Sequence, residues 1–231
     1  MDETISISNL QNTKKWHMQT HKQREERVTD ENATAEEMPI NIIIPSTPSA
    51  SDNLRMMGLY GHIDEEKGAE TAYSLFLMAE SGKALNEETG EVLCAPIKFV
   101  ICTPGGASSD MFAVYDAMRI VGEDCVIETL GLGEVMSGGL LLLAAGTKGQ
   151  RKIGSNCRCM IHSISAGSQG TMHNLENEME EFRWIQDQYI KALSKETKMT
   201  KKQIKKLLDK KIDVYFDAEQ AVKYGIADEI I

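Results

Sequence analysis

Long hydrophobic runs are missing from this sequence. The longest apolar stretch, Gly138 to Ala145, is far shorter than the roughly 20 residues that a transmembrane helix needs, so no membrane-spanning helix is expected. The N-terminus, from Met1 to Glu3, also lacks a basic leader followed by an apolar stretch and a small-residue cleavage site. No secretory signal peptide and no membrane partner are therefore expected.

Positive charge is scarce relative to negative charge. The 231 residues include 25 Lys plus Arg against 35 Asp plus Glu, which gives a formal net charge of -10. A surface that binds nucleic-acid phosphates is basic, so nucleic acid is not an expected partner. With 42% hydrophobic residues, the chain can bury a substantial core as one large domain or at most two small ones.

Cysteine is infrequent and odd in number, with residues Cys94, Cys102, Cys125, Cys157 and Cys159. This pattern predicts reduced thiols and a cytoplasmic location. Cys157 and Cys159 form a C-x-C pair without a second pair, which favours side chains on a strand over a zinc site. His17 and His21 share a helical face but have no third ligand, so we interpret them as solvated.

The N-terminal part of the chain differs from the rest. Residues 1–37 are polar and are expected to form a mobile extension, whereas 38–231 are expected to form a single domain. Within this domain, the isoleucine-rich segment 39–45 is bounded by prolines and predicts one short strand followed by a linker.

Strand-like and helix-like segments alternate from Asn53 onward. Strands are expected at 56–60, 97–102, 125–130 and 158–162, and helices at 64–81, 109–121, after Ser137, at 173–198, and from Thr200 and Asp217. This alternation implies crossover connections and an α/β fold with a mainly parallel sheet. The polar insertion 83–95 predicts a surface hairpin or loop.

Two of the expected helices carry informative apolar patterns. In the helix 64–81, a buried face is expected from Ala69, Ala72, Tyr73, Phe76 and Leu77. The helix 173–198 would be nearly 40 Å long at about 1.5 Å per residue, which is longer than a compact domain of this size requires. We therefore expect part of it to pack against something outside the subunit.

Three features could together perform chemistry: a glycine-rich turn at Gly105 and Gly106, a serine at a strand-to-helix junction, and a histidine that ends the next strand. Ser137 could attack a carbonyl group while unpaired N–H groups of the helix hold the oxyanion, or it could simply cap the helix. It does not fit the G-x-S-x-G elbow, because Val135 replaces the first glycine.

His162 could accept the serine proton and return it to a leaving amine, or it could be an ordinary core or loop histidine. A third group would have to orient the imidazole. Spacing does not choose among the downstream candidates, which are Asp187, Asp209, Asp213 and Asp217.

Several motifs occur in an order that resembles the proteolytic subunit of the Clp peptidase, the ClpP family. They are Thr103–Gly106 (TPGG) followed by Tyr115–Met118 (YDAM), Ser137–Gly149 (SGGLLLLAAGTKG), Arg158–His162 (RCMIH) and Asp213–Gly225 (DVYFDAEQAVKYG). The resemblance covers about residues 53–231. It implies a ClpP/crotonase-type fold of repeated β-β-α units with a mainly parallel sheet and a protruding handle helix, the handle region spanning about 163–198.

The resemblance also implies an activity, that of a serine endopeptidase. Ser137 would be the nucleophile, His162 the general base and Asp213 the residue that orients the imidazole. Gly106 and Gly138 would donate the backbone N–H groups of an oxyanion hole. Gly167, Ser168 and Gln169 would belong to a glycine-rich strand along which extended polypeptide substrates lie.

The same resemblance implies an assembly of heptameric rings stacked as a tetradecamer and fed by a Clp-type ring ATPase. No cofactor is expected in the subunit itself, since no G-x-x-x-x-G-K-[ST] loop for nucleotide occurs in it. The chain departs from the family at Gly138, where a methionine is usual. This departure leaves one alternative open, a catalytically weak or inactive structural subunit. A second alternative is a crotonase-like acyl-CoA enzyme, since the crotonase relatives share the fold and an oxyanion hole.

Overall fold

The computed structural model describes residues 54–210 and 212–231, which all lie in one unit, Asp52–Ile231. The expected mobile extension 1–37, the strand 39–45 and the pair His17 and His21 lie outside the described residues. Among the helices of the described part, none combines the length and the apolarity needed to cross a membrane.

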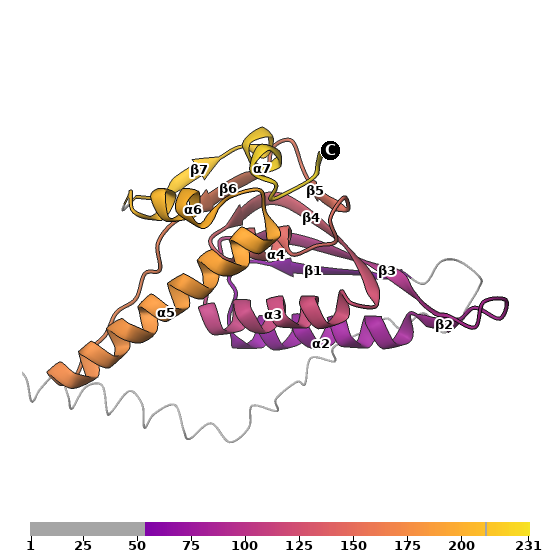
Figure 1. The fold of residues 1–231 in the computed structure, drawn as a ribbon, viewed down its shortest axis with the longest axis horizontal. Helices are drawn as coiled ribbons and strands as arrows, with labels where there is room; N and C mark the ends of the chain where they lie inside the picture. Colours follow the sequence, from indigo (N-terminus) through magenta and orange to yellow (C-terminus); the bar gives the residue numbers. More distant parts are fainter. Residues whose placement is uncertain (1–53, 211) are drawn as a thin grey trace, which may run out of the picture. The chain divides into compact units, whose positions relative to one another are not determined.

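A mainly parallel sheet forms the centre of this unit, as expected (Figure 1). Its main path runs in the order β1-β3-β4-β5-β8 with parallel neighbours, namely Met56–Tyr60, Val92–Thr103, Cys125–Met136, Arg151–Ile153 and Glu229–Ile230. Off this path, β6 (Arg158–Ile161) lies parallel to the end of β4 and antiparallel to β7 (Val214–Phe216). The insertion forms the expected hairpin, because β2 (Lys83–Leu85) pairs antiparallel with the start of β3.

Helices cover this sheet. Their bounds are α2 Glu65–Ser81, α3 Ser108–Val121, α4 Gly138–Ala144, α5 Met172–Glu196, α6 Lys201–Leu208 and α7 Ala218–Tyr224. In Figure 1, α2 and α3 run side by side beneath the strands β1 and β3. The helices expected from Thr200 and Asp217 both begin there with capping boxes, and α7 ends at Gly225 with a left-handed φ of 74°.

The expected buried face of α2 is wrong. Tyr73 is 66% exposed and Leu77 52% exposed, whereas the buried positions are Gly68, Thr71, Leu75 and Ala79. The close approach of α3 explains which face of α2 is buried, because a Cβ atom at Gly68 would lie only 2.8 Å from the Cβ atom of Asp110. The face that carries Gly68 fits against the neighbouring helix, and Tyr73 and Leu77 are left on the outside.

The long helix α5 extends away from the rest of the unit, as Figure 1 shows. Its buried residues, Tyr189, Ile190, Leu193 and Glu196, all lie near its C-terminus, while Met172, Met179 and Trp184 are exposed. The long helix is confirmed, and packing of its exposed part against another molecule stays a prediction.

The expectation of reduced thiols is wrong for two of the five cysteines. Cys94 and Cys125 are joined by a disulfide, with Cα atoms 5.0 Å apart. The cause is the parallel register of β3 and β4, which places these two residues opposite each other. The expected cytoplasmic location, which rested in part on reduced thiols, stays a prediction.

Candidate active site

The junction between β4 and α4 holds Ser137 in an unusual backbone conformation. Its φ of 52° and ψ of -117° make it the one non-glycine residue with a positive φ in the described part of the chain. Such a conformation is costly and persists only where the surroundings hold it. The Ser137 N–H donates to the carbonyl oxygen of Met160 at 2.8 Å, and the Ser137 carbonyl accepts from the Leu140 N–H at 3.1 Å and the Tyr189 hydroxyl at 3.0 Å.

The side chain of Ser137 does not cap α4, because it makes no hydrogen bond to the first turn of the helix. Its Oγ atom instead lies 2.9 Å from Nε2 of His162. The pairing of β6 with the end of β4 produces this contact. Met136 lies opposite Met160, so the residue that follows β6 reaches the residue that follows β4. The interpretation of Ser137 as a helix cap is therefore wrong.

The contact has the geometry of an activated nucleophile. When Nε2 is the unprotonated nitrogen of a neutral imidazole, the hydroxyl donates to it, and the imidazole can take the proton as the oxygen attacks. His162 is half-buried and faces a cavity, so the pair is accessible to a substrate.

Gly106 and Gly138 border the same cavity, and the backbone N–H groups of both are candidates to bind a substrate oxygen. The Ile63 N–H donates to the Gly105 carbonyl at 2.8 Å, and the Ala107 N–H donates to the Ile63 carbonyl at 2.9 Å. This pattern leaves the Gly106 N–H without a backbone partner in the described residues. A Cβ atom at Gly106 would lie 1.9 Å from the Ile63 carbonyl oxygen, so only glycine fits there. Gly138 begins α4, where an N–H has no partner within the helix.

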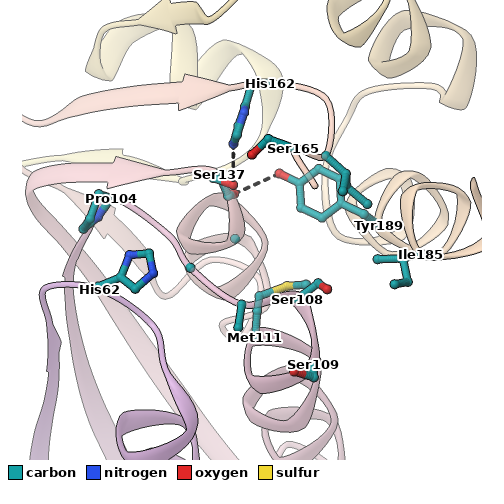
Figure 2. Close-up of a pocket in the computed structure, with 14 residues that line it drawn as sticks. His62, Pro104, Ser108, Ser109, Met111, Ser137, His162, Ser165, Ile185 and Tyr189 are labelled. Carbon is teal, nitrogen blue, oxygen red and sulfur yellow. Dashed lines mark hydrogen bonds between the residues drawn. The ribbon is translucent and has the colours of Figure 1, made fainter. Parts of the chain in front are cut away.

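The cavity has a volume of about 550 Å³ and is partly polar and partly apolar. Its lining consists of His62, Pro104, Gly106, Ala107, Ser108, Ser109, Met111, Ser137, Gly138, His162, Ile164, Ser165, Ile185 and Tyr189. Figure 2 shows His162 and Tyr189 converging on Ser137, with His62 and Pro104 on another side of the cavity. Neither His62 nor Ile185 nor Tyr189 was singled out from the sequence as a residue of the site.

Asp213 lies outside this arrangement in the single chain. It immediately precedes β7 and is exposed, and no hydrogen bond joins its carboxylate to His162 within the described residues. The other three aspartates have different roles. Asp187 forms an ion pair with Lys205 at 3.3 Å, Asp209 ends α6 as an exposed residue, and Asp217 caps α7.

The predicted substrate-binding residues Gly167, Ser168 and Gln169 lie in an irregular segment before α5. The glycine-rich strand expected there is not formed in this single chain. Ser168 borders a second cavity, of about 610 Å³, whose apolar wall is formed by residues of α5 that include Met179 and Phe182.

No group of three or more potential metal ligands occurs in the part of the chain that the structure describes. Cys157 and Cys159 are buried, and the interaction between the two thiols raises the pKa of Cys159 while it lowers that of Cys157.

Comparison with known proteins identifies relatives. The ATP-dependent Clp protease proteolytic subunit 2 of Corynebacterium efficiens is 33% identical over 201 residues, covering 78% of this chain and 95% of that protein. Subunit 1 of Corynebacterium jeikeium is 33% identical over 65% of this chain and 84% of its own length. Subunit 4 of Rhodococcus jostii is 34% identical over 58% of this chain and 68% of its own length.

The family-level comparison covers nearly the whole described region. The model of the Clp protease family matches residues 53–231, which include the β4–α4 junction, β6, α5 and β7. These matches favour neither an inactive structural subunit nor an acyl-CoA enzyme. The chain therefore belongs to the Clp protease family, a family of serine peptidases.

Proposed function

We propose that this chain is a serine endopeptidase subunit in which Ser137 is the nucleophile and His162 the general base. The observation that carries the proposal is the distance of 2.9 Å between Ser137 Oγ and His162 Nε2, at a strained backbone position that borders an open cavity. Membership of the Clp protease family supports the reaction class, the hydrolysis of peptide bonds in polypeptides.

In the first half of the reaction, His162 takes the Ser137 proton while Oγ attacks the carbonyl carbon of the scissile peptide bond. The carbonyl oxygen becomes an oxyanion, which the N–H groups of Gly106 and Gly138 would stabilise. His162 then donates its proton to the leaving amine, which departs and leaves an acyl-enzyme. In the second half, His162 deprotonates a water molecule that hydrolyses the ester and restores Ser137.

Asp213 is the proposed residue that orients the imidazole. The antiparallel register of β6 and β7 pairs Ile161 with Val214, and the same register continued by one residue would place His162 opposite Asp213. Side chains at opposed positions of an antiparallel pair are close enough to interact. Asp213 is also the candidate that neither caps a helix nor forms an ion pair in the described residues. We propose that its carboxylate turns toward the imidazole when subunits assemble.

The assembly and partners follow the same proposal. Heptameric rings stacked as a tetradecamer would bury the exposed part of α5 and enclose the active sites, with Gly167, Ser168 and Gln169 binding extended substrate. The relatives named above are called ATP-dependent, which supports a Clp-type ring ATPase as the partner of this chain as well.

The assignment of the nucleophile is tested by labelling with a fluorophosphonate, which reacts with activated serines. Ser137→Ala is expected to abolish labelling and hydrolysis of fluorogenic peptides without changing the native mass of the assembly. Ser155→Ala, at an exposed turn, is the matched control and is expected to label normally. Labelling that persists in Ser137→Ala, at another residue, would refute the assignment.

A further inference from the structure

We propose that Tyr189 is a positioning residue that holds the Ser137–Gly138 peptide group in the orientation needed for catalysis. The inference rests on the proposed function of Ser137. Tyr189 lies in the C-terminal part of α5, is only 8% exposed, and donates its hydroxyl hydrogen to the Ser137 carbonyl oxygen at 3.0 Å. This bond connects the long helix directly to the backbone of the proposed nucleophile, as Figure 2 shows.

The geometry of the peptide group explains how a bond to the Ser137 carbonyl can affect catalysis. A trans peptide group is planar, and its C=O and N–H bonds point in opposite directions. A partner that fixes the direction of the Ser137 carbonyl therefore also fixes the direction of the Gly138 N–H, one of the two proposed oxyanion donors. The donor must point at the position of the oxyanion to be effective, so a small rotation of this peptide group weakens catalysis.

The backbone at Ser137 needs such support because its φ of 52° is unfavourable for a residue with a side chain. Different elements hold its two sides. Met160 of β6 accepts the Ser137 N–H, while Tyr189 of α5 and the Leu140 N–H of α4 donate to its carbonyl. Of the carbonyl's two partners, only Tyr189 comes from outside the local chain.

The Tyr189 hydroxyl is a dependable donor. Burial raises the pKa of this phenol well above its ordinary value of 10.0, so the hydroxyl stays protonated at neutral pH. A carbonyl oxygen can only accept, so the direction of the bond is fixed. Packing alone does not require a hydroxyl here, since the buried neighbours Ile190 and Leu193 anchor α5 with aliphatic side chains.

The decisive variant is Tyr189→Phe, which keeps the ring and removes the donor. Loss of a direct oxyanion donor costs about 10²- to 10³-fold in kcat, and we expect a smaller, roughly tenfold fall in kcat for this indirect effect, with KM little changed. The rate of labelling of Ser137 by a fluorophosphonate is expected to fall in parallel, because that reaction also develops negative charge on an oxygen in the same hole.

Tyr115→Phe is the matched control. The Tyr115 hydroxyl is also buried and also donates a hydrogen bond, to Glu196 Oε1 at 2.9 Å, but it lies outside the cavity. We expect Tyr115→Phe to lower the unfolding temperature while kcat and the labelling rate stay at the wild-type values. If Tyr189 only stabilises the fold, Tyr189→Phe would likewise lower the unfolding temperature and leave kcat and the labelling rate at the wild-type values.

A second pair of variants keeps the test decisive if Tyr189→Phe does not fold. Gln retains an N–H donor at a similar size to Leu, so Tyr189→Gln is expected to have a higher kcat than Tyr189→Leu. Wild-type kcat in Tyr189→Phe, or equal kcat in the Gln and Leu variants, overturns the inference while labelling of Ser137 in the wild type still supports the proposed function. A wild-type protein that does not label at Ser137 overturns both.

Discussion

The β4–α4 junction and the segment before β7 carry the proposed nucleophile and the proposed orienting carboxylate, and they are held very differently. Ser137 lies between a strand and a helix whose residues are buried, and its backbone has partners on both sides. Asp213 is exposed and has no bond to His162 within the described residues. The subunit's own core therefore holds Ser137 and His162 in contact, whereas nothing in the described residues holds the Asp213 carboxylate toward His162.

The largest expected effect comes from removing the charge of the carboxylate. In assembled protein, Asp213→Asn is expected to lower kcat by about 10⁴-fold, because an amide would hold the imidazole in the wrong tautomer. Peptide hydrolysis by samples of verified native mass measures it. Asp209→Asn, at another exposed aspartate nearby in the sequence, is the control and should retain activity. If the two variants are equally active, Asp213 does not orient His162, and its carboxylate stays apart from the imidazole in the assembly as well.

A smaller but still large effect is expected at Gly106, which lines the cavity beside Ser137. In Gly106→Ala the new methyl group would collide with the Ile63 carbonyl, so the backbone must shift and the Gly106 N–H must move. We expect kcat to fall by about 10²- to 10³-fold, as for loss of one oxyanion donor. Gly90→Ala, in the turn between β2 and β3, is the control: nothing lies within 4 Å of its added Cβ atom, and the strain of alanine at its φ of 74° is expected to affect stability and not activity. Unchanged activity in Gly106→Ala would exclude this N–H from the reaction.

The smallest expected effect on catalysis comes from an ion pair away from the cavity, between Arg151 and Asp228. Hydrogen bonds from Arg151, at 2.8 Å from Nε to Oδ2, lower the pKa of Asp228 from 3.8 to about 2. A lowered carboxylate pKa stabilises the folded state above the unfolded-state value, and this stabilisation is lost as the pH falls from about 4 toward 2.

Asp228→Asn should therefore lower the free energy of unfolding at pH 7 by about 2 kcal/mol and flatten its dependence on acid pH, while kcat stays unchanged. Urea unfolding at a series of pH values, beside peptide hydrolysis, measures both quantities. A fall in kcat here would mean that any loss of stability disturbs the site, which would weaken the interpretation of the Gly106 and Tyr189 variants.

The site was partly predictable from the sequence. Local signals made Ser137 and His162 candidates but left a helix cap and an ordinary histidine open, and the motifs that resemble the ClpP family then selected the two residues. Their meeting depends on the pairing of β6 with the end of β4, a register that spacing does not encode. Tyr189 was not singled out, since no sequence pattern in α5 distinguishes a hydroxyl that reaches a distant carbonyl.

Helix α2 illustrates why burial is harder to predict than helix position. The bounds of the helix agreed with expectation, because helix ends depend on residues close in sequence, such as the N-cap Asp64. Its buried face did not, because the close approach of α3 at Gly68 turns the face with Gly68, Thr71, Leu75 and Ala79 inward and leaves Tyr73, Phe76 and Leu77 outside. The short strands β5, β7 and β8 were also missed, being too brief to show a period.

The amino-acid sequence by itself determined the alternation of strands and helices, the long α5 and the residue types needed for acyl transfer, because these depend on short-range pattern and composition. Only the tertiary structure decided which of these groups meet. Strand register brought His162 to Ser137 and Cys94 to Cys125, and helix packing brought Tyr189 to the Ser137 carbonyl. Contacts between residues far apart in the chain are chosen by how whole elements fit together, and no local segment contains that information.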